Sequence, residues 1–330
     1  MSHSRRQDLA RRRVRYTGET YNQARHALSR LHPAGPPIPH ASRDQAALEA
    51  ALFLQLGRID HSPWPTGAPA FGVTSLTPHR DELVMRIAKP FLPDVIAHIM
   101  PTCAGDDSGE IYGVTGLRAH PGNGHVILYR PGIDGRVRIP VSPAAWDKAA
   151  LVGLGYWWED VQTPWLTHPF EWHPAERAFV DAWPRRLAVG GDFYRDSAFI
   201  SALLRRVHLL HGTDVDYWQM WINSHPGKGY DVHLLWANGG EHTVVVDRLR
   251  DPLFGLGFDD TALHDQLCQC GPDVQCYIKL IHHDADRRHR LFLRRSTEAR
   301  RDIDDCHPSL RSWEERQRQR RQQLCATYGY

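Results

Sequence analysis

An internal repetition is the feature of this sequence that most limits the folds open to it. Residues 71–79 (Phe-Gly-Val-Thr-Ser-Leu-Thr-Pro-His) share their glycine, valine, threonine, leucine and final histidine with residues 112–120 (Tyr-Gly-Val-Thr-Gly-Leu-Arg-Ala-His). A third copy is indicated by residues 225–229 (His-Pro-Gly-Lys-Gly), which differ at one position from residues 120–124 (His-Pro-Gly-Asn-Gly). Segments that recur within a chain usually form one supersecondary unit used more than once. The repetition therefore predicts related strand–turn–strand units.

Apolar stretches on either side of glycine-containing turns predict β-hairpins. After the second copy, the largely apolar residues 125–129 and the alternating residues 136–141 flank a turn with two glycines. Glycine supports such turns because it adopts positive φ without a steric penalty. We expect two more hairpins, from residues 232–236 and 242–246 and from residues 274–281 and 290–293. Residues 77–84 stay open between strand and helix, because a threonine followed by a proline can also begin a helix.

Helices are expected between the strands. Residues 5–31 carry apolar residues at helical spacing on both sides of Thr17 and Gly18, which predicts two short helices in a hairpin. Ser142 followed by Pro143 is a typical cap and first position of a helix. Further helices are expected at residues 43–56, 143–151, 175–183, 197–211, 260–267 and 309–324. Hairpins interrupted by helices predict an α+β fold with largely antiparallel sheets, and they disfavour a doubly wound parallel fold.

The order of these elements divides the chain into five parts. They are a helical hairpin (residues 1–31), a proline-rich linker (32–42), a first α+β lobe (43–190), a second α+β lobe (191–300) and a basic C-terminal helix (301–330). No stretch approaches the roughly 20 consecutive apolar residues of a membrane-spanning helix. Arg5 and Arg6 lack the apolar region that follows the arginines of an export signal. We therefore expect a cytoplasmic protein whose six cysteines are reduced.

Positive charge is concentrated at the two ends of the chain. Only four of the 40 basic residues are lysines, which is typical of GC-rich bacterial genomes and describes the source rather than the function. Residues 1–30 hold eight arginines and two acidic residues, and residues 287–330 hold twelve and six, so each end carries +6. Because the whole chain carries +2, the middle carries −10. The ends could contact nucleic acid or an acidic partner, or fold back on the acidic body.

The candidate nucleic-acid contacts are arginines on the predicted terminal helices. They are Arg11, Arg12, Arg13, Arg316, Arg318, Arg320 and Arg321. Arginine binds phosphate through paired donors, and Trp313 and Tyr330 are available for stacking on bases. Two observations argue against this interpretation. Two N-terminal helices fall short of a three-helix helix-turn-helix module, and the pI of 8.2 lies below the usual range of dedicated nucleic-acid-binding domains.

Histidines supply the candidate catalytic residues. His120 and His225 occupy equivalent places in two His-Pro-Gly turns, where backbone amides could approach an anion or a substrate. His208 and His211 lie one helical turn apart and precede two aspartates, so this group could hold a metal ion. The structural alternative is that glycine and proline determine the turns at His120 and His225, where histidine has no role of its own, and that His208 and His211 stabilise the end of a helix.

A second histidine group includes two glutamates. His168, Glu171, His173 and Glu176 could bind a divalent metal or exchange protons with a substrate. Pro174 competes with that interpretation, because proline typically occupies the first position of a helix and would place Glu176 in the first turn. A carboxylate there interacts favourably with the helix dipole. Capping is the favoured role of Glu176.

The cysteines near the C-terminus suggest a zinc site. Cys268, Cys270 and Cys276 lie close together in the sequence, and Cys306 could complete a tetrahedral set of ligands. The spacing disfavours zinc, because structural sites commonly use pairs of cysteines two to four residues apart and only one residue separates the first two here. Burial in a hydrophobic core is the alternative.

The sequence leaves open whether the protein is an enzyme. It contains no Walker loop, serine elbow, dinucleotide fingerprint or HExxH motif. Our preferred hypothesis is a non-enzymatic cytoplasmic binding protein whose repeated β units contact a macromolecular partner. Nucleic acid, bound through the arginine-rich ends, is one candidate for that partner. The alternative is a metal-assisted hydrolase that uses the histidine groups.

Overall fold

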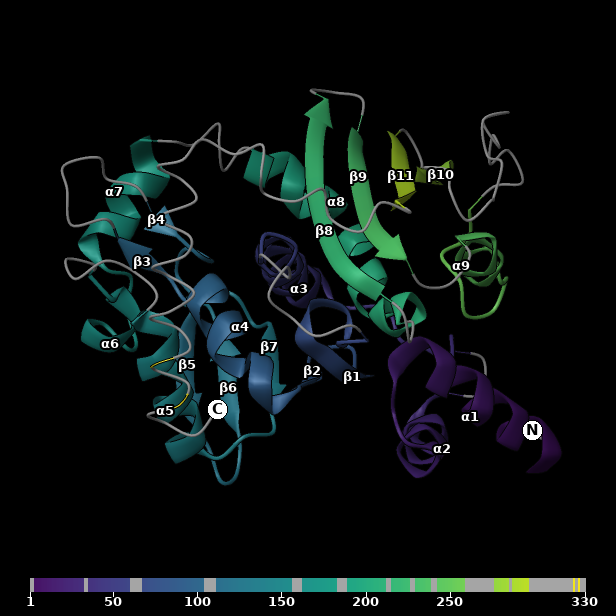
Figure 1. The fold of residues 1–330 in the computed structure, drawn as a ribbon, viewed down its shortest axis with the longest axis horizontal. Coiled ribbons are helices and arrows are strands. Elements are labelled where there is room, and N and C mark those ends of the chain that lie inside the picture. Colours follow the sequence, from purple (N-terminus) through teal and green to yellow (C-terminus); the bar gives the residue numbers. More distant parts are fainter. Residues whose placement is uncertain are drawn as a thin grey trace.

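The computed structural model places helices and strands along most of the chain (Figure 1). The described residues are 3–32, 35–59, 67–103, 111–155, 162–182, 189–211, 215–225, 229–238, 242–258, 276–284, 287–296, 323 and 326. Among them, no helix has the length and apolar character that crossing a lipid bilayer requires. The architecture is α+β with mostly antiparallel strand pairs, which confirms the predicted fold class.

The N-terminal helices form the expected hairpin. Helix α1 (His3–Thr17) and helix α2 (Tyr21–Arg30) pack together at one end of the molecule (Figure 1). The chain turns between them at Gly18, whose φ of 70° is accessible to glycine at low cost. Thr20 and Gln23 then form a capping box that satisfies two backbone donors at the start of α2. Local sequence therefore determines both where α1 ends and where α2 begins.

A five-stranded sheet lies in the first part of the chain. Its strand order is β1-β2-β7-β6-β5, with neighbours antiparallel except for the short parallel pair β2 and β7. The strands are β1 (Val73–Pro78), β2 (Leu83–Ile87), β5 (Arg118–Pro121), β6 (Val126–Tyr129) and β7 (Arg136–Ile139). The pairing of β6 with β7 confirms the hairpin predicted from residues 125–129 and 136–141. Residues 77–84 run from strand to turn to strand and do not form a helix.

A second, four-stranded sheet has the order β10-β11-β9-β8. Its strands are β8 (Val215–His225), β9 (Gly229–Asn238), β10 (Cys276–Asp284) and β11 (Arg287–Ser296). The pairing of β10 with β11 confirms the last predicted hairpin. The strand predicted at residues 242–246 is wrong, because these residues begin helix α9 (His242–Leu249). Strand β9 already pairs with β8 on one side and with β11 on the other, so it has no free edge for residues 242–246.

The repeated motif does not keep one conformation. Gly72 and Gly113 both have positive φ, of 72° and 81°, and the two copies then diverge. The first copy continues as strand β1, whereas residues 113–117 form bends and turns. Gly116 has a φ of 80°, and the first copy has Ser75 at that place, a residue for which left-handed backbone is unfavourable. The expectation that these copies share an extended shape is therefore wrong.

The structure describes six further helices, of which four were predicted and two, at residues 92–99 and 164–167, were not. They are α3 (Arg43–Leu56), α4 (Leu92–Ile99), α5 (Pro143–Leu154), α6 (Pro164–Thr167), α7 (Pro174–Ala182) and α8 (Val189–Leu204), with 3-10 turns η1 (Ala70–Gly72), η2 (Lys89–Phe91) and η3 (Val207–Leu210) and the short strands β3 (Thr102–Cys103) and β4 (Ile111–Tyr112). Ser142 caps α5 by accepting a hydrogen bond from the backbone of Ala145, as expected. The predicted helix 197–211 begins earlier, in α8, and ends as η3. Residues 260–267 and nearly all of 309–324 lie outside the described residues.

Helix α3 lies in the core and carries a buried ion pair. Glu49 on α3 accepts hydrogen bonds from Arg205, which follows α8, at a distance of 2.6 Å between Oε1 and Nη2. Arg205 also donates to the carbonyl oxygens of Pro39 and His79. Ile38 in the predicted linker is buried, so the described part of residues 32–42 packs on the body. One hydrophobic cluster includes residues of both predicted lobes, and the division into lobes stays a prediction.

Candidate functional site

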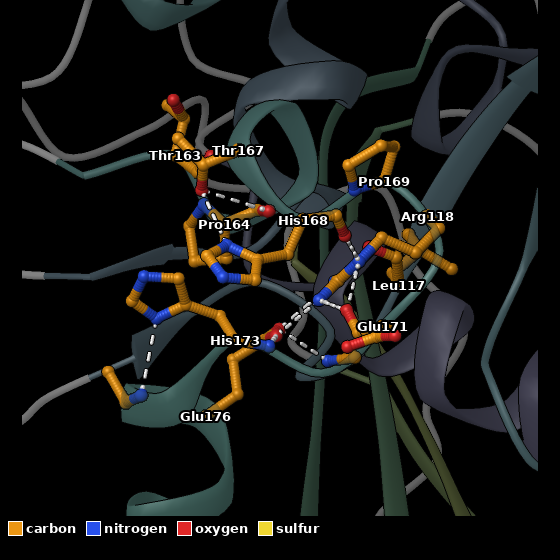
Figure 2. Close-up of polar contacts among 12 residues, drawn as sticks. Leu117, Arg118, Thr163, Pro164, Thr167, His168, Pro169, Glu171, His173 and Glu176 are labelled. Carbon is orange, nitrogen blue, oxygen red and sulfur yellow. Dashed lines mark hydrogen bonds and ion pairs between the residues drawn. The ribbon is translucent and has the colours of Figure 1, made fainter.

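A buried ion pair organises the loop that carries the histidine–glutamate group. Arg118 on β5 and Glu176 on α7 are fully buried, with 2.5 Å between Nη2 and Oε2. Figure 2 shows the guanidinium of Arg118 also directed at two loop carbonyls. These carbonyls belong to His168 and Glu171, at 2.6 Å and 2.5 Å. A buried guanidinium requires such partners, so Arg118 fixes the loop against the sheet.

Glu176 caps helix α7, as the sequence predicts. Its carboxylate accepts hydrogen bonds from the backbone N–H groups of His173, at 3.0 Å, and Gly116, at 2.7 Å. The first bond closes the start of α7, and the second ties the turn before β5 to the same carboxylate. With Arg118 as a third partner, every side of this carboxylate has a structural contact. Glu176 is therefore not available as a metal ligand or as a base.

His168 and His173 lie against each other beside this ion pair. Their ring centroids are 4.7 Å apart and the rings are perpendicular (Figure 2). The Nδ1 atom of His173 accepts a hydrogen bond from the backbone N–H of Ala175, so the proton of the neutral ring is on Nε2. Burial and the neighbouring His168 lower the pKa of His173, which favours that neutral form. A metal ion needs an unprotonated nitrogen, so this arrangement does not favour a metal site.

His208 and His211 also form a pair, with ring centroids 4.2 Å apart. The Nε2 atom of His211 lies 2.9 Å from the carbonyl oxygen of Val73 on β1, which identifies Nε2 as a donor. Burial, followed by the neighbouring His208, lowers the pKa of His211 to about 4. The pair therefore packs η3 against β1 in neutral form. Asp214 and the side chain of Asp216 lie outside the described residues, so the predicted four-residue metal group is not described as a whole.

The histidines of the repeated motif lie far from one another. His79 follows β1 and His120 is on β5, and these are the two edge strands of the five-stranded sheet. Four strand spacings separate them, which corresponds to about 19 Å. His225 ends β8, in the other sheet, where its backbone pairs with Gly229. His120 and His225 thus each lie near the end of an antiparallel strand pair, and His79 and His120 do not share a cleft.

The predicted zinc ligands are not brought together by any described contact. Cys268, Cys270 and Cys306 lie outside the described residues, and Cys276 is described only as the first residue of β10. Among the described residues there is no group of three or more histidine, cysteine or acidic side chains that could hold a metal ion. Cys103 is a free buried thiol, and burial raises its pKa to about 11. The zinc site stays a prediction.

The predicted arginine contacts separate into buried and exposed residues. Arg13 is fully buried, where it pairs with Glu19 at 2.6 Å and donates to the carbonyl of Pro37. Arg13 is therefore removed from the candidate nucleic-acid surface. Arg12 pairs with Asp251 at 2.5 Å, whereas Arg11 is exposed. Arg316, Arg318, Arg320 and Arg321 lie outside the described residues.

Other arginines of the hairpin are exposed and were missed as candidates. With Arg11, the hairpin has six exposed arginines, whose surface we call its basic face: Arg5, Arg6, Arg11, Arg15, Arg25 and Arg30. A helical periodicity could have found two of them. In α2 the buried residues Ala24, Ala27 and Leu28 mark the inner side, so Arg25 and Arg30 must face outward.

Comparison with known proteins adds no further assignment, since no protein-family model, curated protein or solved structure matches this chain. The fold and its sites are therefore interpreted from their own chemistry. Within the described residues, His173 and His211 have structural hydrogen bonds, and the hairpin has six exposed arginines against one exposed acidic residue.

Proposed function

We propose that this chain is a cytoplasmic binding protein that contacts nucleic acid through the basic face of the α1–α2 hairpin. The observation that carries the proposal is an imbalance of exposed charge. In residues 3–32 six arginines are exposed, and Asp8 is the one exposed acidic residue. A cluster of like charges creates a potential that attracts a polyanion and raises its rate of association.

Internal ion pairs account for this imbalance. Glu19, the second acidic residue of the hairpin, is buried against Arg13 and cannot offset the surface charge. Arg12 pairs with Asp251, which lies after α9 on the body of the protein. Tyr16 donates a hydrogen bond to the carbonyl of Arg248 in the same region. The hairpin is thereby attached to the body, and its surface keeps an excess of exposed arginines over exposed acidic residues.

The surface chemistry favours nucleic acid over a protein or a lipid partner. The large exposed apolar side chains of the described residues are Tyr112, Leu151, Leu166, Phe170, Val244 and Leu253, none of which belongs to the hairpin. Protein interfaces usually need an apolar centre, and interfacial membrane binding needs a buried apolar face. Contacts to phosphate need only positive charge and hydrogen-bond donors, which arginine supplies. Recognition through phosphates alone predicts binding with little sequence preference.

Fluorescence anisotropy with labelled nucleic acid tests the proposal. Duplex DNA, single-stranded DNA and single-stranded RNA of mixed sequence are titrated with the full chain at several NaCl concentrations. We expect the logarithm of the association constant to fall linearly with the logarithm of salt concentration. Replacing Arg11 and Arg15 together by alanine should weaken binding and reduce the salt slope by about two.

A matched control uses an exposed arginine at the far end of the molecule. Arg177 lies on α7, at the opposite end from α1 and α2 (Figure 1). Arg177→Ala should leave both affinity and salt slope unchanged. Binding that is absent at low salt, or that is insensitive to salt, would contradict the proposal. Equal effects of the hairpin and Arg177 variants would place the contact elsewhere and overturn the role of the hairpin.

A further inference from the structure

A groove lined by polar residues runs between the two helices of the hairpin. Its cavity has a volume of about 330 Å³. The lining residues are Arg6 and Gln7 from α1 and Asn22, Arg25, His26 and Ser29 from α2. This volume lies at the small end of the range of about 300–1,000 Å³ that is usual for ligand pockets. Unlike most such pockets, the groove has no apolar lining residue.

The periodicity of α2 builds one wall of the groove. Asn22, Arg25, His26 and Ser29 have the spacing i, i+3, i+4 and i+7, which places them along one side of a helix. The buried residues Ala24, Ala27 and Leu28 occupy the other side and hold α2 against the body. This polar side is rigidly presented, because the opposite side is packed.

The charges that line the groove are of one sign. No lining residue is acidic, and each helix contributes one arginine to the lining. Within the described part of the chain, neither Arg6 nor Arg25 has an ion-pair partner. Two arginines in the lining of one cavity give it a positive potential, which favours the binding of an anion.

The donors in the groove fit a phosphate group better than a carboxylate. Arg6 and Arg25 each offer paired N–H donors, and Asn22 offers an amide N–H₂. Ser29 donates its hydroxyl proton to the backbone carbonyl of His26, so it is not needed as a donor to a ligand. One arginine already satisfies both oxygens of a carboxylate in a bidentate pair. Two arginines and an amide have enough donors for the additional oxygens of a tetrahedral phosphate.

We propose that this groove binds a single phosphate group between Arg6 and Arg25. The identification of that phosphate as part of a nucleic-acid backbone rests on the proposed function. The choice of phosphate as the ligand rests on the residues that line the groove. The proposal adds a localised contact to the diffuse attraction of the basic face: one phosphate is bound in a cavity, and the other exposed arginines contribute mainly through their charge.

Two double variants that remove the same charge test the proposal. Arg6→Gln with Arg25→Gln removes two charges from the groove, and Arg11→Gln with Arg15→Gln removes two charges from the basic face outside it. All four residues are exposed, so both variants should keep the thermal midpoint of the parent chain. Inorganic phosphate is titrated into each protein by calorimetry at constant ionic strength, with chloride as the balancing anion. A labelled oligonucleotide is titrated in parallel by anisotropy.

We expect phosphate to bind the parent chain and the Arg11/Arg15 variant with similar affinity, and the groove variant at least tenfold more weakly. Both variants should bind the oligonucleotide more weakly than the parent chain. Phosphate should displace the oligonucleotide from the parent more effectively than chloride at the same ionic strength.

The possible failures are distinguishable. If the oligonucleotide binds but phosphate does not, or if phosphate binds all three proteins equally, the groove proposal is overturned and the proposed function stands. If phosphate binds through Arg6 and Arg25 but no nucleic acid binds, the groove proposal stands for a free phosphate compound and nucleic acid is overturned as its source. If neither ligand binds the parent chain, both proposals are overturned.

Discussion

Gly18 lies so close to His208 that a Cβ atom added to the glycine would be 2.8 Å from the imidazole Nδ1. The same Cβ would lie 2.5 Å from the carbonyl oxygen of Thr74, a backbone atom that cannot rotate away. The turn of the hairpin, the histidine pair and strand β1 therefore meet at one residue. The position of the basic face on the body depends on this close approach.

Gly18→Ala should destabilise the protein by about 3 kcal/mol or more, because it combines a left-handed backbone with a steric overlap. Gly124→Ala is the matched control. Gly124 has a similar φ of 71° but no atom within 4 Å of the added Cβ. Gly124→Ala should therefore lower the free energy of unfolding by about 1–2 kcal/mol. Urea denaturation measures both. Equal losses would show that the close packing at Gly18 has no energetic role.

Glu49→Gln should destabilise the protein by about 3–5 kcal/mol, because it leaves the buried guanidinium of Arg205 without its counter-charge. Glu82→Gln provides the comparison. Glu82 pairs with Arg138 at 2.8 Å, but the two side chains are 24% and 42% exposed, so the loss should stay below about 1 kcal/mol. The measurement is the free energy of unfolding in urea at neutral pH. Similar losses for the two variants would contradict the assigned importance of burial.

Stability should fall as the pH is lowered from 6.5 towards 4. The pKa of His211 in the folded protein is about 4, below its ordinary value of 6.5, so the unfolded chain binds a proton more readily in this window. His211 then contributes up to about 3 kcal/mol of stability above pH 6.5, and this contribution is lost progressively down to pH 4. Burial also lowers the pKa values of His40, His79 and His208, which act in the same direction.

His211→Gln isolates the contribution of this residue, because glutamine can still donate to the carbonyl of Val73 but does not titrate. Urea unfolding of the variant at pH 7 and pH 5 should show a smaller difference in free energy than the parent chain. An unchanged difference would mean that other groups carry the pH dependence.

Arg118→Lys should loosen the loop between α6 and α7 without unfolding the core. Lysine offers one charged group in place of the planar guanidinium that contacts Glu176 and the carbonyls of His168 and Glu171. We expect the amide hydrogens of Gly116 and His173, which donate to Glu176, to exchange at least tenfold faster. Arg177→Lys, on the exposed side of α7, should leave both exchange rates unchanged.

Local signals in the sequence were sufficient for several individual elements. The break at Thr17 and Gly18, the cap at Ser142 and the capping role of Glu176 were predicted because each depends on residues close together in the chain. The hairpin of β10 and β11 was predicted for the same reason. The helix that begins at residue 242 was not predicted, because the three valines of residues 242–246 suit a strand. A strand there is excluded only because β9 already has a neighbour on each side.

The sequence could not show contacts between residues that are distant in the chain. Arg12 has the same composition signal as Arg11, but Arg12 forms an ion pair with Asp251. His120 and His79 share a motif, yet opposite edges of one sheet separate them.

The sequence by itself therefore determined the class of fold, the ends of many helices and the excess of positive charge in the N-terminal helices. Only the tertiary structure decided which arginines remain exposed and which are paired inside. The physical reason is that capping, turns and periodicity are interactions between near neighbours, whereas burial and ion pairing depend on groups such as Arg205 and Glu49 that meet only when the chain has folded.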